Sequence, residues 1–170
     1  MAINCLKTDW QKQNNFCEVI CLMIEATGYI ILGFVLMELS GWAIHKYLMH
    51  GPLWVIHKTH HQHSDSFFEL NDLFSLFFGS IAVLLIFFGA GDLDARFWLG
   101  IGISIYGMLY FFFHDMLIHR RVKWGDRPKS GFVKGILKAH QAHHYSKQKD
   151  GAVSFGLFIV PKKYFKKQGN

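Results

Sequence analysis

Ten of the eleven histidines in this 170-residue chain belong to one phrase that occurs twice. Each copy has two histidines five positions apart, followed by a triplet made of a histidine, two other residues and two adjacent histidines. The first copy is His45, His50, His57, His60 and His61, and the second is His114, His119, His140, His143 and His144. Neutral imidazole is the commonest metal ligand in proteins, so the repeat predicts that these side chains bind iron, zinc, copper or nickel.

The spacing within each copy predicts how the histidines face a metal. Residues three and four positions apart lie on one face of an α-helix, so each triplet is expected to point in one direction. Residues five positions apart are turned by about 140° on an ideal helix, so each pair is expected to flank a site rather than to bind one ion side by side. Structural zinc has four ligands and often includes cysteine, whereas ten histidines far from the three cysteines favour two redox-active irons.

Long apolar stretches must position these histidines. Hydrophobic residues make up 51% of the chain, which is too apolar for a typical soluble protein of this size. Residues 16–40, 73–90 and 97–113 have about the length that crosses a hydrocarbon core of roughly 30 Å as a helix. Residues 1–170 are therefore expected to form a single domain, an all-α integral membrane protein with about three transmembrane helices. Glu25, inside the first stretch, is expected to face the protein interior.

The last two stretches are joined by a short acidic loop and are expected to form a hairpin, so both copies of the histidine phrase lie on one face of the membrane. There they form a helical cap, predicted for residues 45–72 and 114–160, that holds a centre of two metals. Thirteen of the 18 Lys and Arg residues follow His114. Positive residues favour the cytoplasmic side, which predicts a multi-pass inner-membrane protein with a cytoplasmic active site and an external N-terminus. The basic end is expected either to rest on anionic lipid headgroups or to be simply solvated, and its position does not favour nucleic acid.

Two short segments are expected to complete the cap. Gly51 and Pro52 predict the end of the helix that carries the first histidine pair, because proline lacks a backbone donor and restricts the residue before it. Residues 151–160 are apolar but too few to span a membrane, so they are expected to tuck against the histidines.

Sequence around the histidines is similar to that of a known family, the bacterial β-carotene 3-hydroxylases of the membrane fatty acid hydroxylase and sterol desaturase superfamily. The histidine boxes carry the resemblance to the superfamily, and two further phrases, FELND and HD-x3-H-R-R, narrow it to carotenoid hydroxylases. The similar segments are HKYLMHGPLW at 45–54, HKTHH at 57–61, FELNDLF at 68–74, YGMLYFFFHDMLIHRR at 106–121, AHQAHH at 139–144 and VSFG at 153–156.

This resemblance implies a non-haem di-iron monooxygenase that uses O2 and electrons from reduced ferredoxin to hydroxylate carbon 3 of the β-ionone ring. The expected substrate is β-carotene, converted to β-cryptoxanthin and zeaxanthin, with ketocarotenoids such as canthaxanthin, on the way to astaxanthin, as further substrates. A first alternative is a fatty acid or sterol hydroxylase or desaturase of the same superfamily. A second is a non-catalytic membrane protein that binds metal or haem, although one or two axial haem ligands do not explain ten histidines.

Further residues are candidates for supporting roles. Metal-bound histidines usually donate their second ring N–H to a carboxylate or a carbonyl. The polar candidates near the histidines are Glu38, Glu69, Asn71, Asp72 and Asp115. The aromatic residues Trp54, Tyr110 and Phe113 are candidates to line a substrate channel, although such rings more often pack against other side chains or face lipid. His63, the histidine outside the repeat, is expected to be an ordinary interfacial residue.

Overall fold

The apolar stretches fold as long helices in the computed structural model, which describes residues 2–62, 68–122, 125 and 130–166, with side chains from Phe16 onward. The long helices are α1 (Ala2–Ile44), α3 (Asp72–Gly89) and α4 (Ala95–Tyr110). The shorter ones are α2 (Trp54–His61), α5 (Gly131–Tyr145) and a 3-10 turn, Lys162–Phe165. The described residues contain no strand, so the predicted all-α class is confirmed.

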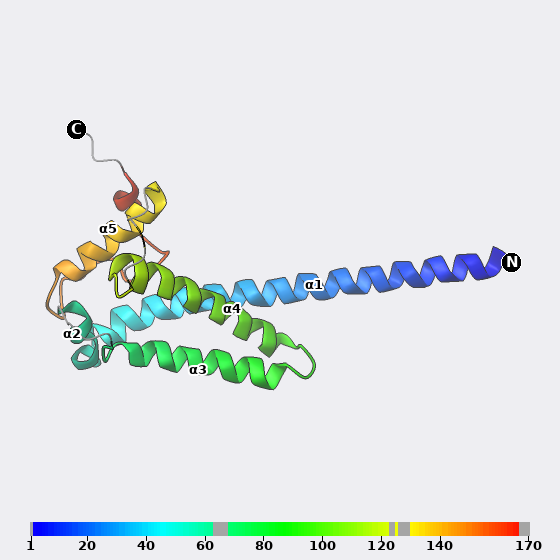
Figure 1. Ribbon diagram of the computed structural model, residues 1–170, viewed down its shortest axis with the longest axis horizontal. Helices are drawn as coiled ribbons and strands as arrows, with labels where there is room; N and C mark the ends of the chain where they lie inside the picture. Colours follow the sequence, from blue (N-terminus) through cyan, green and yellow to red (C-terminus); the bar gives the residue numbers. More distant parts are fainter. Residues whose placement is uncertain (1, 63–67, 123–124, 126–129, 167–170) are drawn as a thin grey trace.

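Three helical segments of the described chain are long and apolar enough to cross a membrane: Phe16–Met49, Asp72–Gly89 and Ala95–Ile118. Their number agrees with the predicted three spans. Helices α3 and α4 form the expected hairpin, and the loop between them lies at the far end of the bundle from α2 and α5 (Figure 1). Asp94 caps the start of α4 by accepting the backbone N–H of Arg96 at 2.9 Å.

Helix α1 differs from the expected first span. It begins at Ala2, and its N-terminal part projects well past the α3–α4 loop (Figure 1). Glu25 is exposed rather than turned to the interior. The prediction for Glu25 is wrong because it assumed that other helices surround this part of the span.

Helices α1 and α4 approach closely at glycines. A Cβ atom on Gly33 would lie 2.5 Å from the carbonyl oxygen of Leu99, and a Cβ atom on Gly102 would meet the carbonyl oxygen of Ile30. Lipid is as apolar as the helix side chains, so close packing of this kind is what holds helices together in a membrane.

A buried carboxylate fastens the C-terminal segment to this helix pair. The Tyr106 hydroxyl donates to Oε2 of Glu38 at 2.7 Å, and the backbone N–H groups of Phe158 and Ile159 donate to Oε1 at 2.9 and 2.7 Å. Glu38 is 6% exposed, and these donors satisfy both of its oxygens. The prediction that Glu38 supports a histidine is therefore wrong: it anchors the segment that contributes carbonyl groups to the site.

The substitution Gly102→Leu should lower the melting temperature of the detergent-purified protein, because the new side chain forces α1 away from α4. Overpacking of this kind costs about 1–3 kcal/mol. Gly28→Leu is the matched control, since nothing lies within 4 Å of a Cβ atom there. Equal melting temperatures for the two variants would contradict the assigned helix contact.

Candidate metal centre

Two π-helical turns carry the histidine pairs. His45–Met49 continues α1, and Phe111–Ile118 continues α4. The backbone N–H of His50 donates to the carbonyl of His45 at 3.0 Å, and the N–H of His119 donates to the carbonyl of His114 at 2.9 Å. Such bonds between residues five positions apart widen the turn, and π-helical turns occur frequently at functional sites.

The wider turn places the two histidines of each pair side by side. Their ring centroids are 5.4 Å apart for His45 and His50, and 4.6 Å apart for His114 and His119. The prediction that each pair flanks a site is therefore wrong, because it assumed the 3.6-residue turn of an α-helix.

Nine of the ten histidines gather in two neighbouring groups, and within each group the ring nitrogens lie within 4.8 Å of one another. Group A consists of His45, His50, His57, His61 and His143. Group B consists of His60, His114, His119 and His140. His144 adjoins group B, with its Nε2 atom 3.2 Å from that of His60, and we count it as the fifth member.

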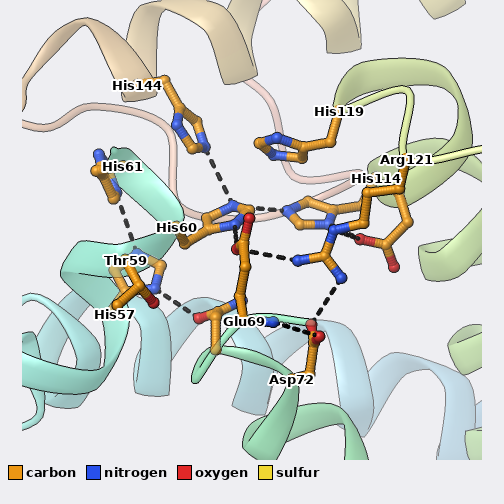
Figure 2. Close-up of polar contacts among 12 residues, drawn as sticks. His57, Thr59, His60, His61, Glu69, Asp72, His114, His119, Arg121 and His144 are labelled. Carbon is orange, nitrogen blue, oxygen red and sulfur yellow. Dashed lines mark hydrogen bonds and ion pairs between the residues drawn. The ribbon is translucent and has the colours of Figure 1, made fainter. Parts of the chain in front are cut away.

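Each group draws on both copies of the repeat in the same pattern. Group A contains the pair of the first copy, the first and last histidines of its triplet, and the middle histidine of the second triplet. Group B contains the pair of the second copy, the first and last histidines of its triplet, and the middle histidine of the first triplet. The middle histidines, His60 and His143, are thus exchanged. The prediction that a whole triplet points one way is wrong, because adjacent residues are turned by about 100° on a helix and the middle member reaches the other group. Figure 2 shows His60 beside His114 and His144, while His57 lies beside His61.

Group A histidines use their Nδ1 atoms to bond neutral acceptors. His57 Nδ1 lies 2.7 Å from the Oδ1 atom of Asn71. The other four bond backbone carbonyls of the segment after α5, as expected for an apolar segment tucked against the site. These carbonyl acceptors are Phe155 for His45 (2.8 Å), Lys149 for His50 (2.9 Å), Ser146 for His61 (2.9 Å) and Val153 for His143 (3.0 Å).

Two histidines of group B, His60 and His114, bond carboxylates. His60 Nδ1 lies 3.0 Å from Glu69 Oε2, and His114 Nδ1 lies 3.0 Å from Asp115 Oδ1. Of the predicted supporting residues, Glu69, Asn71 and Asp115 thus contact histidines directly. Asp72 supports Glu69 instead, because its side chain accepts the backbone N–H of Glu69 at 3.0 Å.

Arg121 joins these carboxylates, and sequence reasoning did not single it out. Its guanidinium lies 2.9 Å from Glu69, 2.8 Å from Asp72 and 3.6 Å from Asp115 (Figure 2). Arg121 is the last residue of the HD-x3-H-R-R phrase, which was the available signal for its role.

Burial keeps the histidines neutral. Desolvation lowers the pKa of His57 to about 3 and the pKa values of His61 and His119 to about 4. An acceptor at Nδ1 places the ring proton there, which leaves a lone pair on Nε2.

The Nε2 atoms of neighbouring rings face one another. They are 3.0 Å apart for His45 and His57, and 3.1 Å apart for His60 and His114, and all four of these rings have an acceptor at Nδ1. Lone pairs at this distance repel unless a cation lies between them. The donor set therefore fits metal ions, and the five nitrogens of group A exceed the four-ligand shell of structural zinc.

An apolar cavity of about 590 Å³ lies against both groups, with His45, His57, His60, His114 and His140 in its wall. Tyr110 lines this cavity, as predicted, and stacks on His114 at 4.4 Å between centroids.

The other two channel candidates lie outside the cavity lining. The Trp54 ring packs beside His50 at 5.2 Å, and the Phe113 ring packs beside Phe158 at 5.5 Å. Both rings are used for packing, which is the alternative role that the sequence offered for them. His63 lies outside the described residues.

Acid should destabilise the metal-free protein. The unfolded chain protonates its histidines near the ordinary pKa of about 6.5, whereas folded His57, His61 and His119 protonate only near pH 3–4. Between these values the unfolded chain binds more protons, so the free energy of unfolding falls as the pH falls below about 6.5. We expect a lower melting temperature at pH 5 than at pH 7.5, and a smaller difference for His61→Gln. A melting temperature that rises on acidification would show that the buried rings are charged.

Comparisons with known proteins agree with this site. A family model described as fatty acid hydroxylase matches residues 30–164. The chain is 35% identical over 133 residues to the beta-carotene hydroxylase of Paracoccus sp. (strain PC1), which covers 78% of this chain and 82% of the relative. It is 40% identical over 140 residues to the beta-carotene hydroxylase of Pseudescherichia vulneris, with 82% of this chain and 80% of the relative covered.

Plant relatives are longer. The chain is 37% identical over 159 residues to beta-carotene 3-hydroxylase 2, chloroplastic, of Arabidopsis thaliana, which covers 90% of this chain but 51% of that protein. No solved structure matches the chain. The family model and the bacterial relatives both extend over most of the sequence, and the residues that the family model matches include both copies of the histidine phrase. The chain therefore belongs to the fatty acid hydroxylase family, and it is a homologue of the bacterial β-carotene hydroxylases.

Proposed function

We propose that this protein hydroxylates carbon 3 of the β-ring of carotenoids, converting β-carotene to β-cryptoxanthin and then zeaxanthin. The observation that carries the proposal is the position of the apolar cavity, which ends on histidines of both groups. The names of the bacterial relatives supply the substrate class. The reaction joins one oxygen atom of O2 to the ring carbon and reduces the other to water, which consumes two electrons and two protons.

Two iron ions, one in each group, are the metals that we propose. Imidazole nitrogen suits iron, and iron would supply the activation of O2 that a C–H hydroxylation needs. The ten histidines would hold the two positions side by side, and outward Nδ1 bonds fix the rings of seven of them in place. The surrounding apolar wall excludes water from the reacting carbon.

Cavity walls indicate how a water-insoluble substrate enters. Val83 on α3 and Met108 on α4 line the cavity and are also 64% and 65% exposed on the surface of the bundle. Both lie in helices that are apolar enough to span a membrane. Gly79 and Gly107 line the cavity as well, and nothing lies within 4 Å of a Cβ atom on either. We infer that the ring end enters between α3 and α4 while the polyene stays in the hydrocarbon.

Selection among ring carbons depends on shape, because the ring has no charge for a side chain to bind. The cavity would place the end ring of the substrate beside the histidines, and such positioning is a large part of catalysis. Shape selection among apolar groups is modest, at about 1–3 kcal/mol per methylene. Ser75 adds a polar group to the cavity wall, so rings that bear a ketone, as in canthaxanthin, fit the same site.

The remaining parts of the proposal concern placement and partners. The basic residues after His114 favour a cytoplasmic active site in a bacterial inner membrane. There, reduced ferredoxin or a similar carrier would deliver the two electrons, since the reaction needs an outside reductant. Residues 1–170 act as one domain in this proposal.

Purified protein should contain close to two irons per chain by elemental analysis. His60→Ala and His143→Ala should each lower the iron content and abolish turnover, because each removes the exchanged ligand of one group. Both variants should still insert in the membrane, since insertion depends on the apolar spans. His63→Ala is the control and should keep both irons. A single zinc per chain with full activity would exclude the di-iron proposal.

Cells that make β-carotene and express this chain, with iron and O2 supplied, should accumulate zeaxanthin by way of β-cryptoxanthin. Gly107→Leu should reduce that product strongly by filling the cavity, whereas Gly28→Leu, outside the cavity, should not. Carotenoid chromatography measures both outcomes. Hydroxylated fatty acids or sterols in place of hydroxylated carotenoids would instead support the superfamily alternative.

A further inference from the structure

We propose that the two metal positions are unequal and that group B holds its ion more tightly than group A. The inference rests on the proposed binding of two metals, and it adds which side chains set the difference. Its basis is the chemistry of the groups that accept hydrogen bonds from the histidines.

The Nδ1 acceptors of group A are uncharged. They are four backbone carbonyls and the side-chain amide of Asn71. Those of His60 and His114, in group B, are the carboxylates of Glu69 and Asp115. A carboxylate behind an imidazole makes the ring a stronger donor and attracts the cation directly. Both groups offer imidazole nitrogens as ligands, so the charge of the acceptors behind the rings is the chemical difference between them.

Local charge adds to the difference. Three carboxylates, Glu69, Asp72 and Asp115, surround the single guanidinium of Arg121, which leaves two negative charges beside group B (Figure 2). The side chains of Arg121, Glu69 and Asp115 are 13%, 11% and 12% exposed, so solvent screens them weakly. Asp150 interacts electrostatically with His50 of group A, but it is exposed, so solvent screens its charge well.

Arg121 is a positioning residue in this arrangement. It comes from the chain just after the second π-helical turn, and it contacts Glu69 and Asp72 at the start of α3. Without it, Glu69 and Asp115 would repel each other and turn away from their histidines. The guanidinium thus allows Glu69 and Asp115 to lie next to histidines of the same group. It neutralises only one of the three negative charges around it.

The test is the stepwise removal of ferrous iron from the full-length protein in detergent under anaerobic conditions. Samples are equilibrated with a graded series of chelator concentrations, and the iron that remains is counted. We expect two steps of one ion each. Loss of an outer carboxylate typically changes metal affinity by about 10–100-fold, so the midpoints should differ by at least that factor.

Substitutions assign the steps to the groups. Glu69→Gln and Asp115→Asn remove charge but keep an oxygen that accepts the histidine N–H. Each should lower the chelator concentration at the midpoint of the tight step by about 10-fold or more, toward that of the loose step. Asn71→Asp is the reciprocal variant: it places a carboxylate behind His57, so the loose step should become tighter. Asp92→Asn, in the loop at the far end of the bundle, is the charge control and should move neither step.

Each outcome decides the matter. Loss of both ions at one midpoint from the unsubstituted protein overturns the inequality, as does a tight step that responds to Asn71→Asp but not to Glu69→Gln or Asp115→Asn. These results leave the proposed two-iron centre intact. A protein that never binds two ions overturns the proposed function itself, together with the inference built on it.

Discussion

The repulsion between unprotonated imidazole nitrogens governs this structure. Burial disfavours the charged rings, and hydrogen bonds hold the ring protons on the outward Nδ1 atoms. The lone pairs that remain point at one another across about 3 Å, as in His45 and His57. Cations would relieve this repulsion, so the histidine cluster is suited to hold metal ions and poorly suited to be an ordinary protein core. Metal binding is then coupled to the stability of the whole cap.

Membrane helices and the cap depend on each other through a few contacts. Glycines let α1 and α4 approach closely, and both helices end in the π-helical turns that carry histidine pairs. Glu38 joins the same helix pair to the C-terminal segment, whose carbonyls orient four histidines of group A. A disturbance between the spans should therefore reach the metal positions. The cavity is lined by residues of α1, α3 and α4 and by histidines of both groups, so the spans also shape the space beside the candidate metal centre.

Much of this arrangement follows from the sequence, and the exceptions have physical causes. Apolar length predicts three spans, and the repeat predicts which residues gather. The π-helical turns are local departures from the ideal helix, and no residue type marks them, so the placing of His50 and His119 beside their partners was not foreseen. The exchange of His60 and His143 depends on how two helices pack across the site. Arg121 and Glu38 make tertiary contacts that spacing along the chain does not reveal.

The most direct test of the central claim is the location of the metals by anomalous diffraction, or by cryo-electron microscopy, of the iron-loaded protein. Data collected at the iron absorption edge should give two peaks in the cap. One should lie among His45, His50, His57, His61 and His143, and the other among His60, His114, His119, His140 and His144. A single peak, or two peaks that each draw only on one copy of the repeat, would contradict the crossed two-metal centre.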